Sequence, residues 1–517
     1  MTNEPVGASN PYWIASTGNT DYPSLNEDIE VDVAIVGGGI AGISTAYLLN
    51  RAGLKVAVIE ADRILQGTTG HTTAKITSQH GLIYAKLKKQ IGEELTRQYA
   101  EANQHAIQQI AETIRENKIE CDFDWRPAFV YTQSGDYLRQ LEDEANAASS
   151  LGIKAGYLDH SPLPFPVKAS LRFEQQAQFH PLKYLKSLAQ LMIRAGGQIF
   201  EHTEAVDIEQ AVQPVVVTRN GNKVSASKVV IASHFPFFDG GNMYFARMYV
   251  EKSYIVAAQT QGPFPQGMFI SAENPTRSLR SQPFAHGEMV LFAGEHHKTG
   301  HDEDTSQHYQ NLIDFAAENF KLKNLLYRWS TQDCMTMDGI PYIGNLTEHN
   351  PDIYVATGFG KWGMSNGTAA AMILTDLIMK GDSPWAKVYN PSRVSLTASS
   401  LKTFITQNAM VAKDLLAGKL QNLPEHTEIG KGEAAVIEYE GKRMGIYRDE
   451  DDKLHMIDTT CTHLGCELAW NSAEKTWDCP CHGSRFSPEG DIIEGPAINK
   501  LHHAEEGDNI VEAKVFK

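Results

Sequence analysis

Short apolar runs separated by polar or glycine-rich stretches organise the first module of the chain. Residues 33–36 and 56–59 are wholly apolar, a pattern typical of strands buried on both faces of a parallel sheet. Residues 41–52 between them are rich in helix formers, so this stretch predicts strand, helix, strand. Apolar runs at 229–232 and 354–357 predict two further buried strands.

Two other patterns fill the region up to residue 380. Apolar residues recur with helical spacing over 85–118, 182–195 and 366–379, and each stretch is predicted to be a helix. Between 243 and 300 apolar and polar residues alternate instead, as in the strands of an antiparallel sheet. These patterns together predict an α/β fold in which an antiparallel-sheet domain is inserted into a parallel-sheet domain.

The composition changes after this module. Gly381, Pro384 and Pro391 mark its end, and residues 401–416 then carry one apolar helical face. We expect a helical linker there that packs on the first module. Short alternating segments rich in Gly and acidic residues follow, which predict a small all-β domain. The expected parts are an N-terminal extension at 1–30, the first module at 31–390, the linker at 391–425 and the all-β domain at 426–517.

The net charge of the chain limits which classes of partner it can bind. The net charge of −17 argues against nucleic acid, whose phosphates would be repelled. Residues 426–517 hold 19 acidic and 10 basic residues, a surface that either attracts a cationic partner or is simply solvated. No run of about 20 apolar residues is present to span a membrane. The N-terminus lacks a secretory pattern, so we expect a cytoplasmic enzyme that could associate with a membrane surface.

Four of the six cysteines are clustered with two histidines near the C-terminus. The spacing is C-x-H-x-x-C, then twelve residues, then C-x-C-H, and the residues are Cys461, His463, Cys466, Cys479, Cys481 and His482. This clustering favours metal binding over a disulfide scaffold, and we expect Cys121 and Cys334 to be buried thiols. A zinc site accepts mixed nitrogen and sulfur ligands. A two-iron cluster with two thiolates on one iron and two imidazoles on the other fits better.

The pattern resembles the Rieske domain of cytochrome bc-type complexes over roughly 426–517. The resemblance implies a [2Fe–2S] cluster in which Cys461 and Cys479 bind one iron, while His463 and His482 bind the solvent-facing iron. Neutral imidazole ligands make such a cluster easier to reduce than an all-thiolate one.

Three further residues follow from the same resemblance. Cys466 and Cys481 match the family's pair that bridges the two loops as a disulfide; two reduced thiols are the alternative in a cytoplasmic chain. Ser484 occupies the position of the family's hydroxyl donor to a cluster sulfide. Phe486 stands where the family usually has Tyr, so one expected donor is missing.

A glycine-rich turn follows the first predicted strand. Gly37, Gly39 and Gly42 form a G-x-G-x-x-G pattern that opens the next helix, and Glu60 ends the second strand. In this setting the pattern is a Rossmann-like dinucleotide fingerprint. The glycines allow a tight turn and close approach to a pyrophosphate, and Glu60 can accept hydrogen bonds from ribose hydroxyls.

Residues 31–390 resemble the D-amino-acid oxidase family of flavoproteins, which includes glycine oxidase and sarcosine oxidase. The segments that carry the match are 67–73, 204–208, 337–344 and 354–364. The resemblance implies FAD, with the cofactor-binding residues Thr69, Gly70, His71, Thr72, Val206, Gly358, Gly363 and Met364. It leaves open whether His71 is linked covalently to the flavin or only hydrogen-bonds the pyrophosphate. The dipole of the 366–379 helix would stabilise negative charge on the flavin if its N-terminus abuts the ring; otherwise the helix only packs on the sheet.

The electron donor is expected to be a small molecule. No second G-x-G-x-x-G with strand context occurs between 100 and 330, which argues against NAD(P)H. Tyr254 and Arg280 could hold a substrate carboxylate, or could be ordinary sheet residues. Lys361 and Trp362 in the flavin turn are the other substrate-side candidates, with His296, His297 and Lys298 as weaker ones. The resemblance implies that an unprotonated amine passes hydride directly to the flavin with little acid–base help, so no catalytic triad is expected.

The two resemblances imply a fused oxidoreductase. Its flavin module would oxidise a small amine or amino acid, and the cluster would pass electrons to an external one-electron acceptor, a protein or a quinone. One alternative is an electron-transfer reductase component whose flavin is reduced by a carrier. Another is a flavin module without catalysis that only docks the Rieske domain.

Overall fold

The computed structural model describes residues 8–302, 304–393, 398–420, 423–424, 427–439 and 441–503, which fall into two compact units. The first unit comprises the chain up to Met243, Ser253–His296 and Tyr309–Thr397. The second unit comprises Tyr244–Lys252, His297–His308 and the chain from Ala398. Two segments of the predicted first module thus belong to the second unit.

A mainly parallel sheet forms one half of the first unit. Its order is β16-β17-β10-β1-β2-β7, and the strands are β1 (Ile29–Val36), β2 (Val56–Ile59), β7 (Gln198–Phe200), β10 (Lys223–Ile231), β16 (Tyr342–Asn345) and β17 (Ile353–Thr357). β1 pairs in parallel with both β2 and β10, whereas β16 pairs antiparallel with β17. The hairpin β8 (Ala205–Gln210)–β9 (Pro214–Thr218) extends β10, and β9 pairs antiparallel with β10. The predicted apolar runs are all buried strands of this sheet.

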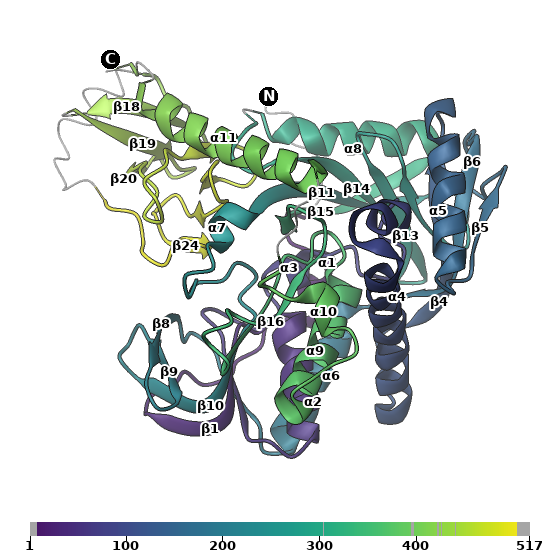
Figure 1. Ribbon diagram of the computed structural model, residues 1–517. Coiled ribbons are helices and arrows are strands. Elements are labelled where there is room, and N and C mark those ends of the chain that lie inside the picture. The colour runs from purple at the N-terminus through teal and green to yellow at the C-terminus, as the bar shows by residue number, and fades with distance from the viewer. Residues whose placement is uncertain are drawn as a thin grey trace. The chain divides into compact units, whose positions relative to one another are not determined.

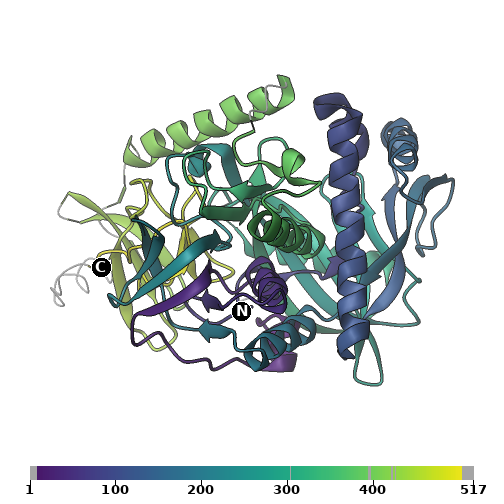
Figure 2. The same cartoon turned by 60° about the horizontal axis from the view of Figure 1, so that its bottom comes forward.

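Three helices pack together beside this sheet. They are α2 (Ile40–Arg51), α6 (Pro181–Arg194) and α9 (Gly363–Lys380), seen side by side in Figure 1. α2 and α9 approach closely: a Cβ added at Gly367 would lie 2.9 Å from Ile40. The long α4 (Tyr84–Asn117) contacts α9, as Figure 2 shows, and is kinked at Gly92. The predicted helices are confirmed within a few residues.

A nine-stranded sheet forms the other half of the first unit. Its order is β15-β11-β14-β13-β12-β4-β6-β3, with β5 paired to β6. The strands are β3 (Lys75–Ile76), β4 (Asp124–Thr132), β5 (Ala155–Leu158), β6 (Ala169–Gln178), β11 (Met248–Thr260), β12 (Met268–Ser271), β13 (Arg277–Phe284), β14 (Gly287–Lys298) and β15 (Leu322–Thr336). Only β4 and β12 pair in parallel among the registers determined. The stretch 243–300 supplies β11–β14 as predicted, while β3, β4, β5, β6 and β15 come from outside it. Short helices complete the unit: α1 (Tyr12–Thr17), α3 (Thr68–His71), α5 (Leu138–Ser150), α8 (Ser306–Asn319, whose first turn belongs to the second unit) and α10 (Ala386–Tyr389).

The second unit contains two small antiparallel sheets. One holds β18 (Ala434–Tyr439), β19 (Lys442–Arg448) and β20 (Leu454–Asp458); the other holds β21 (Ala469–Asn471), β22 (Thr476–Asp478), β23 (Arg485–Phe486) and β24 (Ile492–Glu494). α7 (Tyr244–Arg247), the start of β11 and α11 (Ala398–Leu420) complete it. Val411 and Leu415 of α11 pack against the core around Trp477. Asn408 of α11 also donates to the Ala246 carbonyl of α7 at 3.0 Å. The expected packing on residues 31–390 is therefore seen at α7, whereas the packing on the small all-β domain was not predicted.

Together the two units confirm the predicted fold class. The Rossmann-like half and the inserted sheet make up the first unit, and a small all-β domain is the centre of the second. Within the described ranges no helix is long and apolar enough to cross a bilayer.

Candidate functional site: a flavin turn and an iron–sulfur centre

The glycine-rich turn of the first unit lies between β1 and α2 and leaves no room for side chains. Gly37 has φ +109°, and a Cβ added there would lie 2.4 Å from the carbonyl oxygen of Ala232. A Cβ at Gly42 would lie 1.9 Å from the carbonyl oxygen of Gly37, and Gly39 caps α2. Both close approaches require glycine. The turn therefore fits the role predicted for it, a cradle for the FAD pyrophosphate at a helix N-terminus.

Two polar side chains fix this turn. The Glu60 carboxylate accepts the backbone N–H of Gly38 at 2.7 Å and that of Asp62 at 3.1 Å. The Thr69 hydroxyl accepts the N–H of Ile40 at 3.0 Å. Burial raises the pKa of Glu60, although its backbone hydrogen bonds oppose the shift. The structure thus brings Glu60 and Thr69 to the glycine turn, where an ADP-ribose group can be recognised.

The other predicted FAD residues lie at strand and helix ends of the same unit. Val206 falls at an irregularity in the β8–β9 ladder, between Ala205 and Asp207, so its backbone lies outside the regular pairing. Gly358 follows β17 directly, and Gly363 and Met364 begin α9. The described residues therefore fit FAD at both ends: a helix N-terminus near the flavin turn and an irregular strand where the resemblance places adenine.

The predicted segment 70–72 is held in place by its backbone. A Cβ at Gly70 would lie 2.6 Å from the carbonyl oxygen of Leu65, and Trp13 donates to the carbonyl of Thr72 at 2.7 Å. Nδ1 of His71 lies 2.8 Å from the carbonyl oxygen of Gly67. This contact fixes the ring locally.

We expect His71 to contribute to FAD binding without forming a covalent bond to the flavin. Acid precipitation should give a yellow supernatant and colourless protein, because a cradle of backbone groups and glycines can hold FAD by itself. His71→Ala should then weaken FAD retention about tenfold, the cost of one hydrogen bond to a charged group. The EPR spectrum of the cluster should not change. A yellow pellet would contradict the prediction and show a covalent bond.

Lys361 and Trp362 lie at the entrance to α9, next to a buried histidine that the sequence did not single out. Lys361 donates to the Ser253 hydroxyl of β11 at 3.1 Å. Trp362 stacks on His80, with 4.9 Å between ring centroids and 21° between planes. Burial lowers the pKa of His80 to about 3, so its imidazole is neutral, and it also contacts the Tyr99 and Ser365 hydroxyls. His80 thereby fixes the orientation of Trp362.

Tyr254 and Arg280 are both fully buried but are not brought together with these residues. Tyr254 follows Ser253 on β11, so it points to the opposite face of the strand, where its ring meets Tyr309 edge-on at 4.9 Å. All three nitrogens of the Arg280 guanidinium donate to protein groups, which are the carbonyls of Thr73, Ala74, Phe179 and Ser281 and the Gln282 amide oxygen. The Arg280 guanidinium therefore mainly holds backbone carbonyls in place.

Lys75 is a second group that sequence patterns did not reveal. Its ammonium donates to the Phe269 carbonyl and to the Ser278 hydroxyl, both at 2.7 Å. Burial, with a smaller effect of Arg280, lowers its pKa to about 7. Lys75 can therefore exchange a proton near neutral pH, which no periodicity or motif around it indicates.

In the second unit the two cysteine- and histidine-bearing loops have the same backbone construction. The N–H of Gly465 donates to the carbonyl of Cys461 at 2.9 Å, and the N–H of Gly483 donates to that of Cys479 at 3.0 Å. Both cysteines are buried and lie outside the disulfide. The rings of His463 and His482 lie 5.1 Å apart, nearly perpendicular. The four predicted ligands are therefore brought together.

Their chemistry suits a two-iron cluster. The pKa of Cys461 is lowered to about 7, chiefly by the Cys479 thiol and also by backbone N–H groups and the Ser484 hydroxyl. The pKa of His482 is lowered to about 3 by burial, so its imidazole is neutral. Its Nδ1 is buried and has no hydrogen-bond partner among the described residues, as expected of a metal-ligating nitrogen. Two thiols and neutral imidazole are the ligand set of a Rieske cluster.

Cys466 and Cys481 form a disulfide that joins the two loops, with 6.4 Å between their Cα atoms. The predicted pairing is confirmed, and the alternative of two reduced thiols is not. The buried Ser484 hydroxyl oxygen accepts the N–H of Ala497 at 3.0 Å, which leaves its own proton to be donated. Phe486 is fully buried and carries no hydroxyl for a further donor.

Segments far away in the sequence cover the second cluster loop, which is the loop that carries Cys479 and His482. The ring of Phe245 in α7 lies edge-on to both histidines, 6.3 Å from His463 and 5.9 Å from His482. A Cβ at Gly483 would lie 2.8 Å from Val250, and a Cβ at Gly300 would lie 2.8 Å from the backbone of Pro480. His482 is only 5% exposed. His463, in contrast, is partly exposed, so this centre is shielded within its own unit at His482 and open to solvent at His463.

These features define a flavoprotein with an attached Rieske iron–sulfur centre. Comparison with known proteins agrees: residues 32–377 match the FAD dependent oxidoreductase family, and residues 419–505 match the Rieske [2Fe-2S] domain. The chain belongs to the FAD-dependent oxidoreductases and carries a C-terminal Rieske domain; its cofactors are FAD and a [2Fe–2S] cluster.

Three similar proteins place it more closely. The protein YhfW of Bacillus subtilis (strain 168), named as a Rieske 2Fe-2S iron-sulfur protein, is 43% identical over 97% of this chain and 99% of its own length. Gamma-glutamylputrescine oxidoreductase of Escherichia coli (strain K12) is 24% identical over 72% of this chain and 89% of its own. The crystal structure of glycine oxidase from Geobacillus kaustophilus has the same fold over 71% of this chain and 99% of its own, with a TM-score of 0.60 and 18% identity.

Proposed function

We propose that the enzyme is a dehydrogenase for a small amine or amino acid, and that its electrons leave through the Rieske cluster to an external one-electron acceptor, a protein or a quinone. One observation carries the link between the two cofactors. β11 is a single strand whose residues up to Lys252 belong to the unit that holds the cluster, while those from Ser253 belong to the unit that holds FAD. The cluster unit is therefore built partly from oxidoreductase sequence.

The substrate class rests on the relatives. Gamma-glutamylputrescine oxidoreductase, by its name, acts on an amine derivative, and its similarity extends over most of the flavin module. FAD, when bound, supplies hydride acceptance, and the [2Fe–2S] cluster supplies one-electron transfer. We propose a cytoplasmic location.

The chain's own residues would position the reaction. The glycine turn and Glu60 hold the dinucleotide, and the α9 N-terminus places a positive dipole end beside the predicted flavin turn. We propose Lys361 and Trp362 as the substrate-side residues, since both lie at this turn and remain half-buried. Tyr254 and Arg280 remain secondary proposals, because their side chains are packed or hydrogen-bonded elsewhere.

An anaerobic reductive titration tests the proposal. Primary and secondary amines, amino acids, NADH and NADPH are added one at a time, while the visible flavin band and the EPR signal of the cluster are followed. We expect an amine or amino acid to bleach the flavin and then to produce the EPR signal of the reduced cluster. Lys361→Met should slow the bleaching and leave both resting spectra unchanged.

Each other outcome identifies an alternative. Bleaching by NADH or NADPH alone would show a reductase component that is fed by a carrier. Purified protein without flavin bands would show a module that only docks the Rieske domain. Bleaching by an amine without any cluster signal would contradict electron transfer between the two cofactors.

A further inference from the structure

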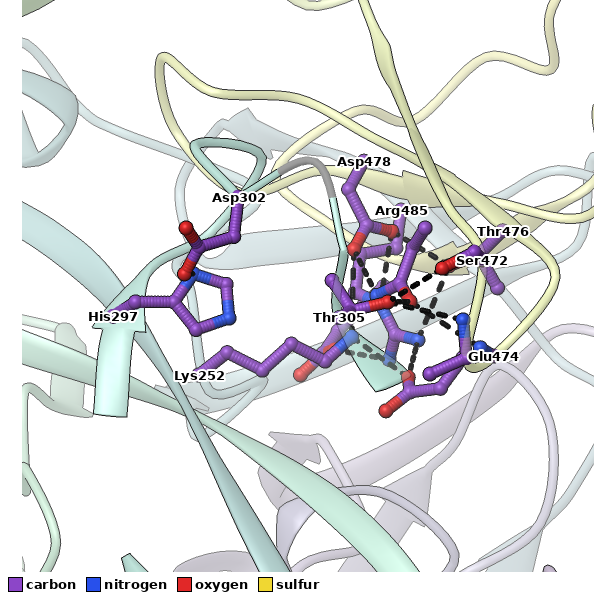
Figure 3. A network of polar contacts seen from close by, with 12 residues as sticks. Lys252, His297, Asp302, Thr305, Ser472, Glu474, Thr476, Asp478 and Arg485 are labelled. Carbon is purple, nitrogen blue, oxygen red and sulfur yellow. Dashed lines mark hydrogen bonds and ion pairs between the residues drawn. The ribbon is translucent and has the colours of Figure 1, made fainter. Parts of the chain in front are cut away.

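Lys252 is a fully buried cation in the second unit and lies beside the second cluster loop. Its side chain is 0% exposed, and its ammonium lies 2.7 Å from the Glu474 carboxylate and 3.4 Å from that of Asp478. Figure 3 shows these side chains converging from β11 and from the β21–β22 hairpin. Asp478 is the residue immediately before the predicted iron ligand Cys479.

Of the two carboxylates around Lys252, Asp478 is fully engaged, whereas Oε1 of Glu474 is buried with no hydrogen-bond partner among the described residues. Asp478 accepts the Asn471 amide at 2.9 Å and the Thr476 hydroxyl at 2.8 Å, and it pairs with Arg485 at 3.2 Å. Arg485 also pairs with Glu474, and with Glu494 at 3.3 Å. Lys252 and Arg485 therefore each pair with the same two carboxylates, Glu474 and Asp478.

The other segment from the oxidoreductase sequence reaches the same hairpin. The Thr305 hydroxyl donates to the Asn471 side-chain oxygen at 2.7 Å and accepts the backbone N–H of Ala473 at 3.0 Å. Asn471 in turn donates to Asp478. Two segments more than 150 residues away in the chain thus fix the hairpin that leads into Cys479.

We propose that Lys252 is a positioning residue of the iron–sulfur site, which fixes Asp478 and the loop of Cys479 and keeps the cluster easy to reduce. Removing one member of a buried charge pair leaves the other uncompensated and is strongly destabilising. Residues that contact the metal ligands, without binding the metal themselves, orient these ligands and affect how tightly the metal is retained. Reduction adds one negative charge to the cluster, which a nearby positive charge stabilises.

The inference rests on the cluster and not on the identity of the substrate. Its experiment therefore uses chemical reductant and redox mediators on the full-length protein. Four variants are compared with wild type: Lys252→Met, Lys252→Arg, the double variant Lys252→Met/Glu474→Gln, and the control Lys431→Met. Lys431 belongs to the same unit, and its ion pair with Asp452 is half-exposed. The readouts are iron and sulfide per chain, resistance to an iron chelator and the midpoint potential from EPR.

We expect Lys252→Met to lose its iron at a chelator concentration at least about tenfold lower than wild type does. This is the usual effect on metal affinity of removing a residue that supports a metal ligand. The cluster that remains should have a lower midpoint potential. Lys252→Arg should keep both properties, and the double variant should recover both because it removes one charge of each sign. Lys431→Met should match wild type.

The result that overturns the proposal is a Lys252→Met protein with wild-type chelator resistance and potential. If Lys252→Met fails to fold, the other variants decide. A double variant that folds and retains FAD but lacks the cluster shows that charge compensation is not the role of Lys252. A Lys252→Arg protein that folds but lacks the cluster would also show that charge compensation is not the role of Lys252.

Discussion

Replacing His482 by alanine is expected to abolish the rhombic EPR signal of the reduced cluster, with loss of most of the iron and sulfide. His482 is buried, its imidazole is neutral, and its Nδ1 has no partner among the described residues. An alanine there would remove one of the two proposed nitrogen ligands of a single iron. The wild-type protein should contain about two irons and two sulfides per chain.

His455→Ala is the matched control. His455 lies in the same unit, is also largely buried, and forms a 2.9 Å contact with the Asp449 carboxylate. Its loss should leave the iron content and the EPR spectrum unchanged, although some stability is lost. An unaltered rhombic signal in His482→Ala would contradict the ligand assignment. One zinc and no iron in the wild-type protein would contradict the cluster itself.

Both cofactors could be predicted from the sequence because each leaves a local signature. Gly37, Gly39 and Gly42 are needed within a single turn, and the spacing around Cys461 and Cys479 is set within two short loops. The disulfide was implied by the resemblance of these loops to the Rieske domain, and not by their spacing alone. The glycine turn and the two cluster loops are each formed by residues close together in the chain. Residue types and their spacing are therefore sufficient to predict them.

The composition of the second unit could not be predicted in this way. The stretches around Lys252 and Lys298 alternate like the rest of the sheet, and nothing in that alternation indicates where a strand leaves one unit and enters another. A lysine on a strand is usually exposed, whereas Lys252 is buried because its partners, Glu474 and Asp478, come from more than 220 residues later. Such pairings are a property of the tertiary fold.

The residues on the substrate side of the first unit could not be predicted from the sequence either. Arg280 was a reasonable candidate for binding a carboxylate, but its guanidinium is used to hold backbone carbonyls of Thr73 and Ala74. His80 and Lys75 had no sequence signal, yet the fold places His80 against Trp362 and lowers the pKa of Lys75 to about 7. Burial created both properties.

Gly37→Ala is expected to remove FAD from the protein while the cluster remains. Two independent costs arise at this position. The backbone has φ +109°, which alanine rarely adopts, and the new Cβ would lie 2.4 Å from the Ala232 carbonyl oxygen. The turn must move, and the backbone groups that face the pyrophosphate move with it. Overpacking costs about 1–3 kcal/mol, so FAD retention should fall by roughly tenfold or more.

Gly53→Ala separates strain from cofactor binding. Gly53 has a similar φ of +95° in the same unit, but a Cβ there would meet nothing within 4 Å. It should lower the free energy of unfolding by about 1 kcal/mol and retain FAD. FAD per chain after desalting is measured by absorbance, and the cluster by EPR after reduction with dithionite. Equal FAD in Gly37→Ala and Gly53→Ala would show that the glycine turn does not hold the dinucleotide. Loss of FAD in Gly37→Ala alone, with the rhombic signal intact, would show that this turn binds FAD and that the cluster is retained without it.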